Sequence, residues 1–103
     1  MMHGEVLMHG NPAGILESQS GGVTEFRYHA TYSGPPVSVT LPVRSEPYTF
    51  SGFPSFFDGL LPEGTNLDML LAQHKLQADE VMLQLLAVGS NLIGAVTVKK
   101  SEP

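Results

Sequence analysis

The sequence contains no cysteine, which excludes disulfides, cysteine-ligated zinc sites and thiol nucleophiles. It also lacks an apolar run approaching the roughly 18 residues that a membrane-spanning helix needs. The N-terminus has no cationic segment followed by an apolar stretch, so no signal peptide is visible. We therefore expect a cytoplasmic protein that has no membrane partner.

Basic residues are scarce. Five lysines and arginines stand against ten acidic residues, which gives a net charge of −5. Binding to DNA phosphates needs several clustered cations, and the only adjacent pair is Lys99-Lys100. We therefore expect no direct nucleic-acid binding. Between Arg44 and Lys75 the sequence holds four acids and no base, which suits a basic partner surface as well as ordinary solubility.

Length and composition predict a single globular domain over 1–103. The 103 residues fit the usual size of one domain, about 100–200 residues. A hydrophobic content of 42% with 15% charged residues is typical of a folded chain rather than a disordered one. A chain of this length is too short for a protein kinase or a TIM barrel.

The first half of the chain predicts short strands separated by turns. Residues 24–28 and 37–41 alternate polar with apolar side chains, as half-buried strands do. Short apolar stretches at 5–8 and 15–16 flank a Gly-Asn-Pro-Ala-Gly turn and predict a hairpin. We interpret 43–51 as an irregular connection.

The periodicity becomes helical in the second half. Apolar residues over 53–61 recur at the spacing of one helix face, and Pro62 ends that helix. Thr65 fits the N-cap of a second helix. A third helix is predicted to begin with Asp79 as its N-cap and to end at Gly89.

A last strand is predicted at 95–98. Because strands and helices are segregated along the chain, the order predicts an α+β fold, in which a small, mainly antiparallel sheet of about five short strands, the last one C-terminal, packs with three helices. The predicted structural core consists of the apolar side chains on the inner faces of these elements: Phe26, Val39, Leu41, Phe53, Phe56, Phe57, Leu60, Leu61, Leu70, Leu85, Leu86 and Val96.

Patterns that carry catalysis or metal binding are missing from the sequence. It contains no Gly-x-Ser-x-Gly, phosphate-binding loop or kinase motif. No two histidines have the helical spacing of a metal site. We therefore expect no catalytic residue, no metal, no cofactor and no enzymatic activity. The histidines in question are His3, His9, His29 and His74.

The segment 62–66, which we call the elbow, ends one predicted helix and starts the next within a few residues. A short turn of this kind can hold its side chains outward on a fixed scaffold, as functional loops do. The elbow is therefore the candidate partner-binding site. It consists of Pro62, Glu63, Gly64, Thr65 and Asn66.

Nearly the whole chain resembles the N-terminal subdomain of HipA-type serine/threonine kinase toxins. The most specific motif is Phe-Phe-x-x-Leu-Leu-Pro-Glu-Gly, which matches 56–64. The family commonly has an arginine just after this motif, whereas this chain reads Thr-Asn-Leu-Asp at 65–68. The other points of resemblance follow in chain order: Gly14-Ile15-Leu16, Phe26-Arg27-Tyr28, Val37-Ser38-Val39-Thr40-Leu41-Pro42, the helix from Asp79 to Gly89, and Gly94-Ala95-Val96.

The resemblance implies a role in a toxin–antitoxin system. A HipA kinase continues past the Gly-Ala-Val strand into a large catalytic body, so the 103 residues are most similar to the small HipS antitoxin subunits of tripartite HipBST systems. There the kinase toxin, HipT, lacks this subdomain, and HipB is a helix-turn-helix DNA-binding protein. The expected partners are thus a HipA-like kinase and, in a ternary complex, a HipB-like protein.

Three functions remain open on the sequence. The first is an antitoxin subunit that inhibits the kinase in trans, with the elbow docking near its ATP cleft. The second is a structural subunit that the kinase needs for folding or target recognition, with neutralisation by the DNA-binding partner. The third is a small enzyme, against which the absence of a nucleophile constellation argues.

Overall fold

The computed structural model describes residues 2–62, 64–89 and 94–101. Five strands form one sheet in the order β4-β3-β2-β1-β5, and every neighbouring pair is antiparallel. The predicted α+β class, with a sheet of about five strands and three helices, is confirmed. The elements are β1 (Met2–Met8), β2 (Asn11–Ser18), the 3₁₀ turn η1 (Ser20–Gly22), β3 (Val23–Tyr28), β4 (Tyr48–Ser51), α1 (Ser55–Asp58), α2 (Thr65–His74), α3 (Val81–Val88) and β5 (Val96–Ser101).

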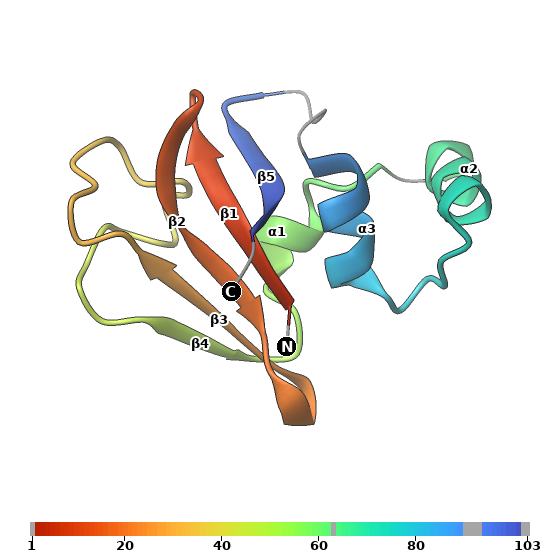
Figure 1. The fold of residues 1–103 in the computed structure, drawn as a ribbon, viewed down its shortest axis with the longest axis horizontal. Helices are drawn as coiled ribbons and strands as arrows, with labels where there is room; N and C mark the ends of the chain where they lie inside the picture. The colour runs from red at the N-terminus through yellow and green to blue at the C-terminus, as the bar shows by residue number, and fades with distance from the viewer. Residues whose placement is uncertain (1, 63, 90–93, 102–103) are drawn as a thin grey trace.

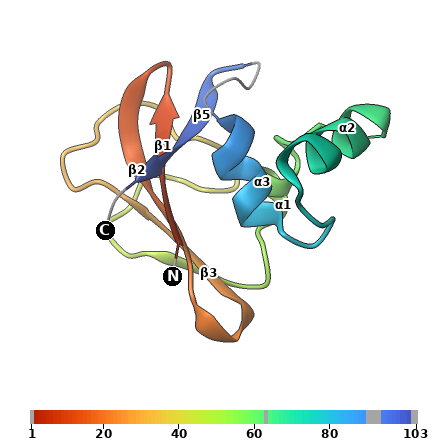
Figure 2. The ribbon, with the colours of Figure 1, turned by 45° about the vertical axis from the view of Figure 1, so that its right-hand side comes forward.

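The helices lie on one side of the sheet (Figure 1). α1 and α3 pack against the strands, whereas α2 stands farthest from the sheet in both ribbon views (Figures 1 and 2). No helix in the described part of the chain has the length and apolarity needed to cross a membrane.

The β1–β2 hairpin turns earlier than predicted. Its loop is the two-residue turn His9-Gly10, and both residues have positive φ, 50° and 81°. Two positive φ angles are typical of a type I′ turn, whose twist matches that of the flanking strands. β2 therefore begins at Asn11 and takes up the residues expected to form the turn, with a register shift between Val6 and Leu7.

The predicted strand at 37–41 is wrong, and so is the placing of Val39 in the core. Val37 and Leu41 are buried, but the chain turns between them, and Val39 at the tip is 92% exposed. The backbone nitrogen of Leu41 donates to the oxygen of Ser38 (3.0 Å), and the Ser38 hydroxyl accepts from the nitrogen of Thr40 (3.2 Å). Hydrogen bonds between a serine side chain and the nearby backbone compete with the hydrogen bonds that pair strands in a sheet.

The edge strand β4 lies in the segment that the sequence suggested was irregular. Its aromatic residues pack partly against the core, and it pairs with β3 through Phe26 opposite Tyr48 and Thr24 opposite Phe50. The Arg44 guanidinium lies 3.7 Å from the centre of the Tyr48 ring. A period-2 pattern does run through Tyr-Thr-Phe-Ser, but four residues form a stable strand only when a neighbour pairs with them.

The helix boundaries differ from the predictions at four ends. α1 spans only Ser55–Asp58, because Pro54 has an extended backbone, and hydrogen-bonded turns carry the chain on to Leu61. No side chain caps α2 or α3, so the predicted caps Thr65 and Asp79 are wrong. Glu80 occupies the N-cap of α3, and its carboxylate accepts from the nitrogen of Gln77 (2.9 Å) instead.

The core lies between the sheet and the helices α1 and α3. Phe26 is fully buried at its centre, with ring centroids 4.8 Å from Tyr28 and 5.4 Å from Phe57. Phe53, Phe56, Leu60 and Leu86 are partly buried and pack against this cluster, and Leu70 is buried on α2. The predicted core residues that are buried within it are Phe26, Leu41, Phe57, Leu61, Leu85 and Val96.

Candidate partner-binding site

The elbow is anchored on its N-terminal side by Leu61. After α1, the nitrogen of Leu60 donates to the oxygen of Phe57 (3.2 Å), and that of Leu61 donates to Asp58 (3.1 Å). The Leu61 side chain is buried in the core. Pro62, which is half-buried, then leads out of the core, and Glu63 lies outside the described residues.

Gly64 sets the direction in which α2 leaves the elbow. It is exposed and has φ 61° and ψ −134°, a conformation that favours glycine. Its carbonyl oxygen accepts the nitrogen of Asp68 (3.1 Å) and so begins the helix. A Cβ at this position would meet no atom within 4 Å. The glycine is therefore required by the backbone conformation and not by crowding.

Thr65 and Asn66 carry the exposed polar groups of the elbow. Both are exposed, and neither side chain hydrogen-bonds to another described residue. Gly64 holds the N-cap position, so Thr65 already belongs to the first turn and cannot cap the helix in the predicted way. Its hydroxyl and the Asn66 amide are consequently directed to solvent, where a partner can bind them.

Helix α2 is held at its inner face by Leu70, while the preceding residue, Met69, is 64% exposed. The link from α2 to α3 is fixed by Gln84, a buried polar residue that the sequence reasoning missed. Its amide donates to the carbonyl oxygens of Gln77 (2.9 Å) and Ala78 (3.2 Å). These bonds satisfy the buried amide and hold the segment that positions α2.

The described charged residues that flank the elbow in the sequence are acidic. Asp58 precedes the elbow and Asp68 lies in the first turn of α2, and both are exposed. The sequence places no lysine or arginine between Arg44 and Lys75. The surface around the elbow is therefore suited to a partner with basic groups.

Two histidines that appeared scattered in the sequence pair with glutamates on the sheet face opposite the helices. His3 contacts Glu17, and His29 lies 3.0 Å from Glu5. Side-chain hydrogen bonds with Gln19 and with His3 stabilise the Glu17 carboxylate, and they lower the pKa of Glu17 below its ordinary value. Among the described residues, no three His, Asp or Glu side chains come close enough to hold a metal ion.

Nearly the whole chain matches a known protein family and a solved structure. The family model described as HipA N-terminal domain matches residues 4–99. The chain belongs to the HipA N-terminal domain family. Among solved structures, this HipA N-terminal domain is similar to one described as the N-terminal domain of HipA toxin. The TM-score is 0.79 and the identity 25%, and the match covers 99% of this chain and 94% of the other.

A relative of this HipA N-terminal domain is an uncharacterized protein from Haemophilus influenzae. The two are 26% identical over 99 residues, which covers 96% of this chain and 92% of the relative. Both matches run through the elbow, so the predicted site lies within the part of the chain that the family shares.

Proposed function

We propose that this protein is an antitoxin subunit that binds a HipA-like serine/threonine kinase in trans and inhibits it, as HipS subunits do in HipBST systems. The observation that carries the proposal is the match to the HipA N-terminal domain over 4–99, with a TM-score of 0.79 to the corresponding domain of HipA toxin. The chain then docks on the kinase where the corresponding domain does in a HipA protein.

The elbow supplies the contact in this proposal. Gly64, Thr65 and Asn66 are exposed, and they lie between the buried anchors Leu61 and Leu70. Held in this way, the elbow approaches the nucleotide cleft of the kinase and keeps it from binding ATP. Because the anchors are buried in the fold, the elbow is already positioned when a partner binds its exposed groups.

One face of the molecule is large enough for this contact. A specific interface buries roughly 800 Å² on each partner, and the accessible surface of the chain is 6172 Å². The interface therefore needs only a small part of the surface, such as the side that bears the elbow and α2.

The chain performs no catalysis of its own in this proposal and acts in the cytoplasm beside the kinase. Its net charge of −5 leaves operator binding to a helix-turn-helix subunit. Contact with that subunit is indirect, through the kinase.

The direct test is to purify the chain with the kinase encoded beside it and to measure ATP binding by the kinase with and without the chain. We expect the chain to suppress ATP binding, and its expression alone to restore growth of cells that express the kinase. Rescue that requires the helix-turn-helix subunit as well would contradict inhibition by this chain and favour the structural-subunit alternative.

The role of the elbow is tested with Thr65→Ala combined with Asn66→Ala. The matched control is Asn11→Ala combined with Thr31→Ala, which removes one amide and one hydroxyl from exposed positions outside the elbow and α2. We expect the elbow double variant to inhibit the kinase less than the wild type does, and the control double variant to inhibit it as well as the wild type does. Both double variants should keep the melting temperature of the wild type. Full inhibition by the elbow pair would show that the elbow is not the effector.

A further inference from the structure

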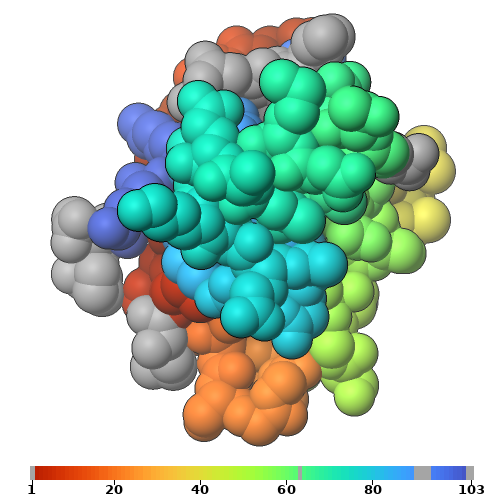
Figure 3. Space-filling view, turned by 90° about the vertical axis from the view of Figure 1, so that its right-hand side faces the viewer, coloured from red at the N-terminus to blue at the C-terminus, as the bar shows by residue number. Residues whose placement is uncertain are grey.

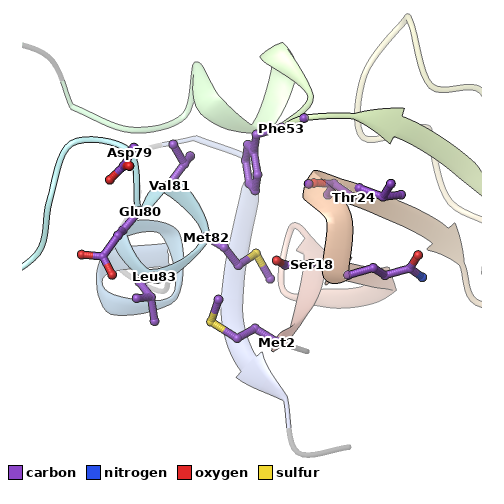
Figure 4. Close-up of a pocket in the computed structure, with 13 residues that line it drawn as sticks. Met2, Ser18, Thr24, Phe53, Asp79, Glu80, Val81, Met82 and Leu83 are labelled. Atoms are coloured by element: carbon purple, nitrogen blue, oxygen red, sulfur yellow. The ribbon is translucent and has the colours of Figure 1, made fainter.

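A cavity of about 280 Å³ opens where the start of α3 faces the end of β2 and the start of β3 (Figure 4). Its apolar part includes Met2, Phe53, Met82 and Leu83, and its polar part includes Ser18 and Thr24. These residues come from five separate segments of the sequence, so no local motif predicts the cavity. Small-molecule sites are usually about 300–1,000 Å³, and this smaller volume suits a large side chain of a partner protein.

The apolar wall of the cavity is adaptable and partly exposed. Met82 is buried, whereas Met2, Phe53 and Leu83 are half-buried and accessible from the opening. In Figure 4 the side chains of Met2, Met82 and Phe53 converge on one space. Methionines fit irregular partners because their side chains are unbranched and polarisable. Exposed apolar surface in a concavity of this kind favours docking of another apolar group.

The rim of the cavity is acidic. Asp79 and Glu80 belong to the lining at the start of α3, and neither forms an ion pair with a described residue. On the opposite wall, Gln19 is polar and uncharged. No lysine or arginine is among the described residues that line the cavity. An apolar floor under an acidic rim is complementary to a side chain with an apolar stem and a cationic head.

The cavity lies on the same side of the molecule as α2. Figure 3 shows the segment that opens α3 (cyan), the η1 turn (orange) and α2 (teal) facing the viewer together. A partner that covers this face can therefore contact both α2 and the cavity.

We propose that this cavity is a second docking point, which receives from the kinase a segment that carries an arginine or lysine next to a large apolar residue. The inference rests on the proposed function for the identity of the partner. The apolar side chain fills the space between Met2, Phe53 and Met82, and the cation lies at the Asp79 and Glu80 rim. The elbow and the cavity then hold the kinase at two separate points.

Two variants test the cavity with the kinase complex. Ser18→Phe places a ring in the cavity, and Asp79→Lys reverses the charge of an exposed rim residue that makes no hydrogen bond to a described residue. We expect each to weaken kinase binding about tenfold or more, as changes at interface hot spots do. The matched control Glu46→Lys reverses an exposed charge in the loop before β4, outside the cavity, and should leave affinity unchanged.

A cross-linking arm does not depend on the stability of these variants. Since the chain has no cysteine, Leu83→Cys gives a unique attachment point for a photo-cross-linker at the cavity, and Ser45→Cys gives a matched exposed control. We expect the cavity probe to capture a kinase peptide with a basic residue beside a large apolar one. The control probe should not capture that peptide.

The outcomes separate the two proposals. If the wild-type chain inhibits the kinase, but Ser18→Phe and Asp79→Lys bind it with unchanged affinity, the cavity is not a docking point and the proposed function stands. Capture of an acidic or wholly polar peptide by the Leu83→Cys probe also contradicts the proposal that the cavity is a docking point. If the wild-type chain does not bind the kinase at all, both proposals fail.

Discussion

The hydroxyl of Tyr28 donates a hydrogen bond to the backbone oxygen of Leu41, and it accepts one from the backbone nitrogen of Val37 (3.0 Å). One buried side chain at the end of β3 thereby holds both ends of the turn that exposes Val39. A phenol with the ordinary pKa of 10.0 is protonated at neutral pH and can donate, and burial raises the pKa of Tyr28 further.

Replacing Tyr28 with phenylalanine is expected to destabilise the protein by about 1–3 kcal/mol, because two buried backbone groups lose their partner. Urea denaturation measures this loss as a change in the free energy of unfolding. Tyr32→Phe is the control, since its hydroxyl bonds to the exposed Pro35 oxygen, and it should cost much less. Equal losses for the two variants would contradict the role assigned to Tyr28.

Gly89 lies against β5 at the end of α3. A Cβ at this position would lie 2.2 Å from the carbonyl oxygen of Val98, so α3 and β5 must move apart to admit one. We expect Gly89→Ala to cost about 1–3 kcal/mol, as overpacking does, and to lower the melting temperature. Gly59→Ala is the control, because the nearest atom to its Cβ would be 3.2 Å away; a melting temperature for Gly89→Ala that matches this control would refute the crowding.

Phe57 lies in a helical apolar pattern and Val39 in a strand-like one, so the sequence predicts that both are core residues. Only Phe57 is buried. Phe57→Ala should lose about 3–5 kcal/mol of stability, which approaches the total stability of a small domain. Val39→Ser should change stability by less than about 0.5 kcal/mol, as exposed substitutions do. Thermal melts of the two variants check the contrast, and a large loss for Val39→Ser would mean that the 37–41 segment is a buried strand after all.

The lowered pKa of Glu17 predicts a dependence of stability on pH. A carboxyl whose folded-state pKa is depressed contributes stability above its ordinary value of 4.5, and this contribution disappears as the pH falls through the lower folded-state value. Glu17→Gln should therefore make the stability less dependent on pH below about 5. Denaturation curves at several pH values test this, with Glu46→Gln as the exposed control, whose pH dependence should match that of the wild type.

Regular alternation and helical spacing in the sequence determined much of this fold. The polar–apolar alternation of 24–28 gave β3, and the apolar spacing after residue 80 gave α3 and its end at Gly89. Both signals are local, because a half-buried strand or helix needs only its own residues to mark the buried face. The motif at 56–64 likewise indicated the family that the comparisons later showed.

Tertiary structure decided the features that depend on residues far apart in the chain. The segment around Val39 alternates like a strand, yet it turns because Tyr28 holds Val37 and Leu41 and because serine bonds to the local backbone. β4 forms because its backbone pairs with that of β3. The cavity at α3 forms between β1, β2, β3 and the start of α3 when these elements pack together. No single segment of the sequence could therefore predict it. The reason is physical: hydrogen bonds between distant segments and the shape between packed elements are properties of the assembled fold, whereas periodicity is a property of the chain.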